Sequence, residues 1–381
     1  MNTFCRLCEL YNSFSFIRLL NAFTKVVNPN YLLLVVEILF LNFITIVIII
    51  YITLYFKKRK FFFTRKVQQE MEVWVTQAIL NDFEGERQFA IPKSFFRLLR
   101  NNLTKQFVID ELIKIKKNVT GTAANNVIAL YESLDLKKYS LRKIRKRKWY
   151  EKTRGIHELY SMQQIDTLKK IYKDTNSKNE YVRMEAQVGV INMTGFDGLL
   201  FLNIVTYPIT EWQQIKLLDQ LKSSEDEGQL ATNIPSWLES SNDTVVVFSL
   251  RLAEVYQQFS VYDSVVKCLR HLNVSVRIQA IKTLVQIANK ETPLLLTEHY
   301  KGETFTNQIA ILDALLKIAT FEQSWFLIDL LDDENDLIKL KAARALAVCF
   351  SGGMEILEEK AKAPYGPYKK ILLHIKYEMG K

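Results

Sequence analysis

VSVRIQAIKTLV, at residues 274–285, has two counterparts elsewhere in the chain: EYVRMEAQVGVI at 180–191 and DLIKLKAARALA at 336–347. All three place an aliphatic residue, a cation, two further residues and then an alanine in the same order. Weaker copies put other short side chains where the alanine stands, at Gln214, Ser249 and Ala310. These positions recur every 28 to 35 residues. A period of this length, with two helices per unit, is typical of stacked helical repeats.

The pattern resembles that of HEAT repeats, in which a Val-Arg-x-x-Ala-x-x-x-Leu helix follows a turn that contains Asn or Asp, here Asn273 and Asn335. The resemblance implies that residues 155–381 form a curved α-solenoid of helix pairs that acts as a scaffold. It also implies structural roles for the cation, which pairs within the turn, and for the alanine, which lets neighbouring helices approach closely. Those positions are Arg183, Ala186, Arg277, Ala280, Lys339 and Ala342.

Other features of the sequence are also typical of an all-α fold. The chain has only seven prolines and 12 glycines among 381 residues. Apolar residues recur at helical spacing, as in 165–172 and 312–319, and the sequence lacks runs of short alternating strands. At four expected helix starts, Ser or Thr is followed three residues later by an acid or Gln, which is a capping-box pattern. Those four residues are Ser177, Thr210, Ser260 and Thr320.

Residues 31–56 form a different kind of apolar segment. Nineteen of its 26 residues are Leu, Ile, Val or Phe, and its single charge is Glu37. A bilayer's hydrocarbon core needs roughly 20 apolar residues in a helix, whereas a cleaved signal peptide is shorter and ends at small residues. The segment therefore predicts a single transmembrane helix. Glu37 and Asn42 are candidates for contacts with another membrane helix, with snorkelling of Glu37 to the interface as the alternative.

Cations flank this segment unequally. Residues 57–66 hold six Lys or Arg, whereas residues 1–30 hold three. The positive-inside rule then predicts that residues 1–30 lie outside a cell or plasma membrane, and that the basic stem at 57–66 and the rest of the chain lie in the cytoplasm. Four consecutive cations of the stem are candidates for contact with anionic headgroups: Lys57, Lys58, Arg59 and Lys60.

The net charge of +10 comes from two segments of the chain. One is the stem, and the other is residues 137–154, which carry ten basic residues and one acid, Glu151. From residue 155 to residue 381 there are 24 basic and 29 acidic residues. A body with this charge binds polyanions poorly, so nucleic acid is not an expected partner.

The basic run ends a region, 67–154, in which we expect divergent helical pairs. Five of its cations lie so close together that we expect their counter-charges to come from outside the chain. Three interpretations stay open: a surface for anionic lipids at about 1 kcal/mol per cation, a nucleic-acid patch with Tyr139, Trp149 and Tyr150 for stacking, and a solvated face. The five candidates for lipid contact are Lys143, Arg145, Lys146, Arg147 and Lys148.

No motif in the sequence nominates an enzyme. The four histidines are scattered, and the sequence has no HExxH, GxGxxG, P-loop or GxSxG motif. We therefore expect no catalytic residue, cofactor or metal. Cys5 and Cys8 form an isolated CxxC whose role stays open, and Cys268 and Cys349 fit buried apolar positions.

Together these patterns predict a non-enzymatic, single-pass membrane protein with a cytoplasmic HEAT-like solenoid. The solenoid would bind a membrane-associated protein partner, for example an enzyme or transporter of which this chain is an accessory subunit. Two alternatives from other classes remain. One is a membrane tether for nucleic acid through residues 137–154, and the other is a HEAT-like enzyme with a ligand in its groove.

Overall fold

The computed structural model describes residues 29–80, 91–222, 228–363 and 366–380. Every element within these residues is helical, so the all-α prediction is confirmed. The chain divides into two compact units, Met1–Leu130 and Tyr131–Lys381. Cys5 and Cys8 and most of the predicted N-terminal segment 1–30 lie outside the described residues.

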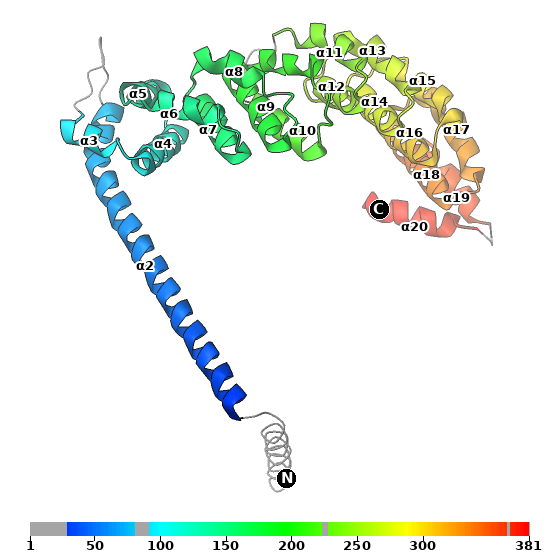
Figure 1. The fold of residues 1–381 in the computed structure, drawn as a ribbon. Coiled ribbons are helices and arrows are strands. Elements are labelled where there is room, and N and C mark those ends of the chain that lie inside the picture. The colour runs from blue at the N-terminus through cyan, green and yellow to red at the C-terminus, as the bar shows by residue number, and fades with distance from the viewer. Residues whose placement is uncertain (1–28, 81–90, 223–227, 364–365, 381) are drawn as a thin grey trace. The chain divides into compact units, whose positions relative to one another are not determined.

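Helix α2 (Pro29–Leu80) is the longest element of the first unit (Figure 1). It runs without a break through the predicted transmembrane segment and the basic stem, because Lys, Arg and Phe do not interrupt a helix. At 1.5 Å per residue its 52 residues extend about 78 Å, more than twice the roughly 30 Å of a bilayer core. Leu33–Thr76 is the one stretch, among the described residues, that is long and apolar enough to cross a membrane.

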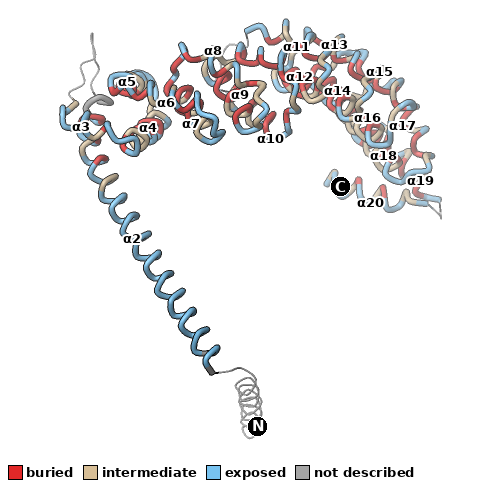
Figure 2. Tube along the Cα trace, viewed as in Figure 1, coloured by how far each residue is buried: buried red, intermediate tan, exposed pale blue. Residues whose placement is uncertain are grey.

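Burial divides α2 into two parts. Residues 33–62 are exposed along their whole length (Figure 2). Beyond them Val67, Met71, Trp74 and Val75 are buried at helical spacing. This face belongs to a small core with α3 (Lys93–Leu98) and α4 (Asn102–Lys117), in which Trp74 meets the ring of Phe95 edge to face at 5.0 Å between centroids. Helix α5 (Gly121–Ser133) then leads into the second unit.

The second unit consists of helix pairs in which a shorter first helix precedes a longer second one. The first helices are α6 (Leu136–Ile144), α8 (Leu168–Tyr172), the 3-10 helix η2 (Gly195–Asn203), α11 (Leu230–Leu238), α13 (Tyr262–Lys267), α15 (Thr292–His299), α17 (Ser324–Asp329) and α19 (Gly353–Ala361). The second helices are α7 (Trp149–Ser161), α9 (Glu180–Thr194), α10 (Glu211–Leu221), α12 (Asp243–Val255), α14 (Val274–Gln286), α16 (Phe305–Ile318), α18 (Asp336–Cys349) and α20 (Tyr368–Glu378).

Neighbouring pairs pack on each other in chain order. Helix α12 contacts α14, α14 contacts α16, and α16 contacts α18, while α11, α13, α15 and α17 cover their own partners (Figure 1). Short 3-10 turns extend several first helices, among them η4 (Cys268–Arg270) and η5 (Tyr300–Gly302). The buried apolar side chains join into one cluster from Ile144 to Ile375. Each pair therefore buries its apolar face against the pairs beside it.

Side-chain caps fix where the second helices begin. Five of them start at an Asn or Thr whose side chain accepts a hydrogen bond of 2.8 to 3.3 Å from a backbone N–H two or three residues on. These N-caps are Asn179, Thr210, Asn242, Asn273 and Asn335.

The capping-box expectations have mixed outcomes. Thr210 caps α10 as predicted, and Thr320 forms a complete box with Gln323. The prediction for Ser177 was wrong, because the carboxamide of Asn179 caps α9 instead. Ser260 lies inside the 3-10 helix η3 (Phe259–Val261) and caps nothing.

We call the position seven residues after the N-cap of a second helix its crowded position, because in α9, α12, α14 and α18 it holds a small side chain without exposed surface. Ala186, Ser249, Ala280 and Ala342 occupy it and are completely buried. In α10 and α16, which begin after Thr210 and Thr304, the same position holds Leu217 and Ile311. The assignment of Gln214 and Ala310 to it from the sequence was therefore wrong.

An earlier unit went unrecognised in the sequence. Helix α7 begins after Lys148, and seven residues later stands Gly155. A Cβ atom on Gly155 would lie 2.8 Å from Cβ of Lys143 and 2.9 Å from the carbonyl oxygen of Ser140. Helices α6 and α7 are thus so close at this point that only glycine fits at position 155. The repeat pattern starts before residue 155, inside the region that was expected to be divergent.

Candidate interaction surfaces

The cations of the repeat pattern, Arg183, Arg277 and Lys339, contact groups in or near the turns that precede their helices. Nη1 of Arg183 donates to the carbonyl oxygen of Ser177 at 2.8 Å, and its guanidinium lies 4.6 Å from the ring centroid of Tyr207. Nζ of Lys339 lies 3.4 Å from Oδ1 of Asp336. These contacts lie within or next to the turn that precedes each second helix.

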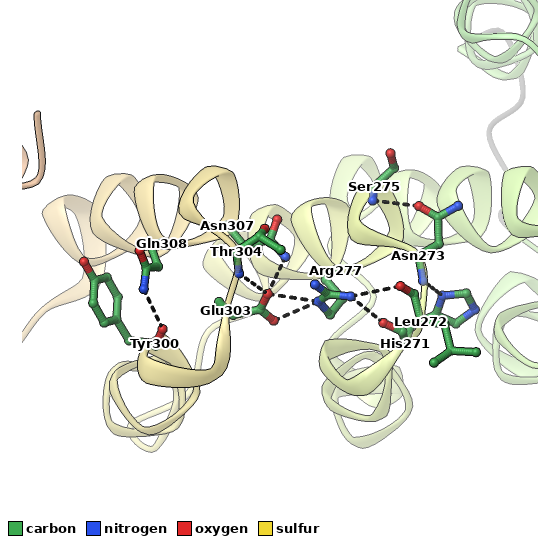
Figure 3. A network of polar contacts seen from close by, with 10 residues as sticks. All are labelled: His271, Leu272, Asn273, Ser275, Arg277, Tyr300, Glu303, Thr304, Asn307 and Gln308. Atoms are coloured by element: carbon green, nitrogen blue, oxygen red, sulfur yellow. Dashed lines mark hydrogen bonds and ion pairs between the residues drawn. The ribbon is translucent and has the colours of Figure 1, made fainter. Parts of the chain in front are cut away.

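Arg277 makes the largest such set of contacts (Figure 3). Its Nη1 donates to the carbonyl oxygens of His271 and Leu272 at 2.8 and 3.1 Å. Its Nε donates to both carboxylate oxygens of Glu303, at 2.9 and 3.0 Å, and Glu303 also accepts from Nδ2 of Asn307 at 2.7 Å. Because Glu303 precedes α16, Arg277 ties one helix pair to the next.

A groove of about 500 Å³ lies along α14 and α16, with Glu254 of α12 at its edge. Its floor is apolar and is formed by Ile278, Ile281, Val285, Ile309, Ala310 and Ala314. Charged side chains of both signs stand around it: Glu254, Lys282, Asp313 and Lys317. Lys282 and Lys317 are exposed and have no ion-pair partner in the described part of the chain, whereas Asp313 pairs with Lys341 at 2.5 Å.

Lys143 does not belong to the exposed basic run. Its side chain is buried, with 5% of the residue exposed, and Nζ lies 2.5 Å from Oε1 of Glu158, which is itself buried. Oε2 of Glu158 accepts from the Ser140 hydroxyl at 2.6 Å, and the Ser140 oxygen accepts from Tyr131 at 2.8 Å. Burial raises the pKa of Tyr131, so the phenol stays protonated and donates.

The prediction that these cations need external counter-charges was therefore wrong for Lys143. It was also wrong for Lys146, which forms an ion pair with Glu151. The partner of Lys143 lies 15 residues away on α7, which could not be known before α6 and α7 were placed side by side. Arg145, Arg147 and Lys148 remain exposed and without an ion-pair partner in the residues that the structure describes.

A second titratable cluster joins α7 to α9. Nδ1 of His157 lies 2.7 Å from the Tyr160 hydroxyl and 3.0 Å from Oε1 of Glu185, and the Tyr160 hydroxyl donates to the same oxygen at 2.8 Å. Burial alone would raise the pKa of Glu185, but the hydrogen bonds from His157 and Tyr160 outweigh it and leave that pKa lowered. Burial raises the pKa of Tyr160. The cluster is a satisfied interhelical contact.

The remaining candidates lie apart from these surfaces. Glu37 and the stem cations Lys57, Lys58, Arg59 and Lys60 are exposed on α2, and Nδ2 of Asn42 donates to the carbonyl oxygen of Ile38 at 2.9 Å within the same helix. Burial raises the pKa of the Cys268 thiol to about 11. In the parts of the chain that are described, no three His, Cys, Asp or Glu residues are grouped so that they could hold a metal ion.

No protein-family model and no curated protein matches the chain. Among solved structures, the crystal structure of an engineered protein from the Northeast Structural Genomics Consortium is similar to it, with 14% sequence identity and a TM-score of 0.31. That similarity covers 75% of this chain and 98% of the other. Likeness at this level carries no argument about fold or activity.

Proposed function

We propose that this chain is a single-pass membrane protein whose cytoplasmic HEAT-like α-solenoid binds a membrane-associated protein partner. The observation that carries the proposal is the exposure of α2. Its residues 33–56 are apolar on nearly all sides, and no other part of the described chain covers them. Apolar surface left in water costs roughly 25 cal/mol per Å², and a helix that is hydrophobic all round belongs in protein or lipid. A bilayer supplies that environment.

The HEAT-like assignment is supported by the recurring geometry of the second unit. The capping Asn or Thr and the buried residue seven positions later recur in five second helices, and in α9, α10, α14 and α18 a polar residue stands four positions after the N-cap. Arg183 and Arg277 each donate to a carbonyl six residues back, and Gln214 donates to that of Ile209 at 3.2 Å. Repeats that pack only on their neighbours form extended surfaces, which are suited to binding other proteins.

The groove along α14 and α16 is the surface that best fits a protein segment. An apolar floor flanked by charges of both signs is complementary to one face of an amphipathic helix, which binds by placing side chains at i, i+3, i+4 and i+7 into such a groove. A membrane anchor would raise the effective concentration of a partner in the same membrane without adding a contact. In this proposal the groove binds the partner and α2 holds the chain in the partner's membrane.

Site-specific photocrosslinking in the native membrane tests this proposal. A photoreactive phenylalanine analogue would replace Ala310 on the groove floor or, as the control, the exposed Leu294 on α15. We expect one adduct of defined mass from position 310 only. Adding Ile309→Glu, which places a charge on the apolar floor, should abolish it. Equal adducts from both positions, or an adduct that survives Ile309→Glu, would refute the groove as the binding surface.

A further inference from the structure

Six consecutive residues, Arg145–Tyr150 (RKRKWY), are exposed between the end of α6 and the first turn of α7. The first four lie in the turn and the last two begin α7. Such a run is unusual in this unit, because the connections before α9, α12, α14 and α18 carry capping Asn residues instead. The segment therefore has no evident role in starting its own helix.

The cations of this turn are only partly compensated by the chain. Lys146 pairs with Glu151, and the nearby Lys152 pairs with Asp174 at 2.6 Å. Arg145 and Arg147 have no ion-pair partner among the described residues, and Lys148 faces the ring of Tyr150 at 5.9 Å. Three exposed cations thus lie within a few residues of Trp149 and Tyr150, and one of them faces an aromatic ring.

The rings come from two neighbouring second helices. Trp149 of α7 stacks on Tyr181 of α9, with 4.8 Å between centroids and 24° between planes, and Tyr150 meets Trp149 edge to face at 5.9 Å. Although they touch each other, Trp149, Tyr150 and Tyr181 are 45%, 51% and 55% exposed. Trp and Tyr with one wet and one apolar side are enriched where a bilayer meets water.

We propose that this basic–aromatic patch (Arg145, Arg147, Lys148, Trp149, Tyr150 and Tyr181) docks on an anionic membrane surface. The cations would lie at the lipid phosphates, and the rings would enter the headgroup region. A membrane is favoured over nucleic acid because Trp and Tyr are enriched at bilayer interfaces and because the proposed anchor would keep lipid phosphates close to the patch. The inference rests on the proposed membrane anchor, since α2 would confine the patch to the neighbourhood of a bilayer.

The test uses the full chain in nanodiscs that contain brominated phosphatidylcholine, with or without phosphatidylserine. Bromine quenches a tryptophan that reaches the interface, and the signal of Trp149 is isolated by subtracting that of Trp149→Phe. We expect quenching of Trp149 with phosphatidylserine that disappears in high salt. The triple variant Arg145→Gln/Arg147→Gln/Lys148→Gln should reduce the equilibrium constant for docking on the order of 100-fold, because each cation contributes about 1 kcal/mol.

A matched variant controls for net charge. Lys169→Gln/Lys170→Gln/Arg270→Gln removes three exposed cations away from the patch and should leave quenching of Trp149 unchanged. Equal quenching with and without phosphatidylserine, or equal losses in the two triple variants, would overturn the proposal. So would binding of an oligonucleotide at physiological salt without quenching by lipid. Failure of the chain to co-elute with nanodiscs would instead refute the anchor, and with it the basis of both proposals.

Discussion

Leu41 in α2 and Leu284 in α14 are the same residue in the same kind of helix, yet they have opposite environments. Leu41 is 69% exposed, whereas Leu284 is completely buried. Most apolar residues of α14 lie on faces that other helices cover, while those of α2 before residue 57 point in every direction and meet no other helix in the part of the chain that the structure describes. Apolar residues on one face therefore identify a helix that packs on protein. Apolar residues on all faces over some 20 positions identify a helix that needs a lipid environment.

The largest expected effect is that of a charge at the crowded position of the second unit. Ala280→Arg would overpack the contact between helices and bury an unpaired guanidinium, which together cost at least about 5 kcal/mol of unfolding free energy. Lys282→Glu, two residues away and exposed, should be nearly silent. Denaturant unfolding of the full chain in nanodiscs, followed by fluorescence of the buried Trp237, measures both. Equal tolerance of the two changes would contradict the repeat register.

Replacing a leucine by alanine should have different effects in α14 and in α2. Leu284→Ala removes buried methyl groups and leaves a cavity, which costs about 2–5 kcal/mol. Leu41→Ala removes the same atoms from a helix with no protein packed on it, so the same unfolding measurement should detect no change. Destabilisation of comparable size by Leu41→Ala would mean that another part of the chain covers α2.

A smaller effect is expected at Gly155. Gly155→Ala places a methyl group 2.8 Å from Cβ of Lys143 and 2.9 Å from a backbone oxygen, so α6 must move, at about 1–3 kcal/mol. Gly302→Ala is the control because a Cβ there would meet nothing within 4 Å. Thermal unfolding of both variants gives the difference. A Gly155→Ala variant as stable as wild type would show that α6 and α7 are not in close contact.

The smallest effect is a pH dependence. The pKa of Glu185 is lowered in the folded protein, so its contribution to stability is present above its ordinary pKa and is lost as the pH falls through the lowered value. As the pH falls below the ordinary pKa of a glutamate, the wild type should therefore lose more stability than Glu185→Gln. Parallel pH profiles of unfolding would show that the contact with His157 and Tyr160 contributes nothing.

The parts of the fold that the sequence predicted are those set by local pattern. The Val-Arg-x-x-Ala pattern located α9 and α14, and in both helices the alanine is buried at the expected point. Composition and length likewise located the apolar part of α2. These features depend on residues within one or two helical turns, so no knowledge of the tertiary structure is needed to recognise them.

The errors arose where a partner distant in sequence decides the outcome. Lys143 was assigned to the surface because its partner Glu158 lies on the next helix. The register of α16 was wrong by one residue because Ile311, not an alanine, fills the crowded position, and Thr304, not an Asn, precedes the helix. Gly155 was missed although it stands 31 residues before Ala186 at the same spacing, a signal that was available in the sequence.

The central claim is that α2 crosses a membrane and leaves the second unit on the cytoplasmic side. The most direct test is protease digestion of a C-terminally tagged chain in alkali-washed membrane vesicles of known sidedness. We predict that the tag stays with the washed membranes, survives in right-side-out vesicles and is digested in inside-out ones. Digestion in right-side-out vesicles would reverse the orientation, and release of the tag by the alkaline wash would contradict the anchor itself.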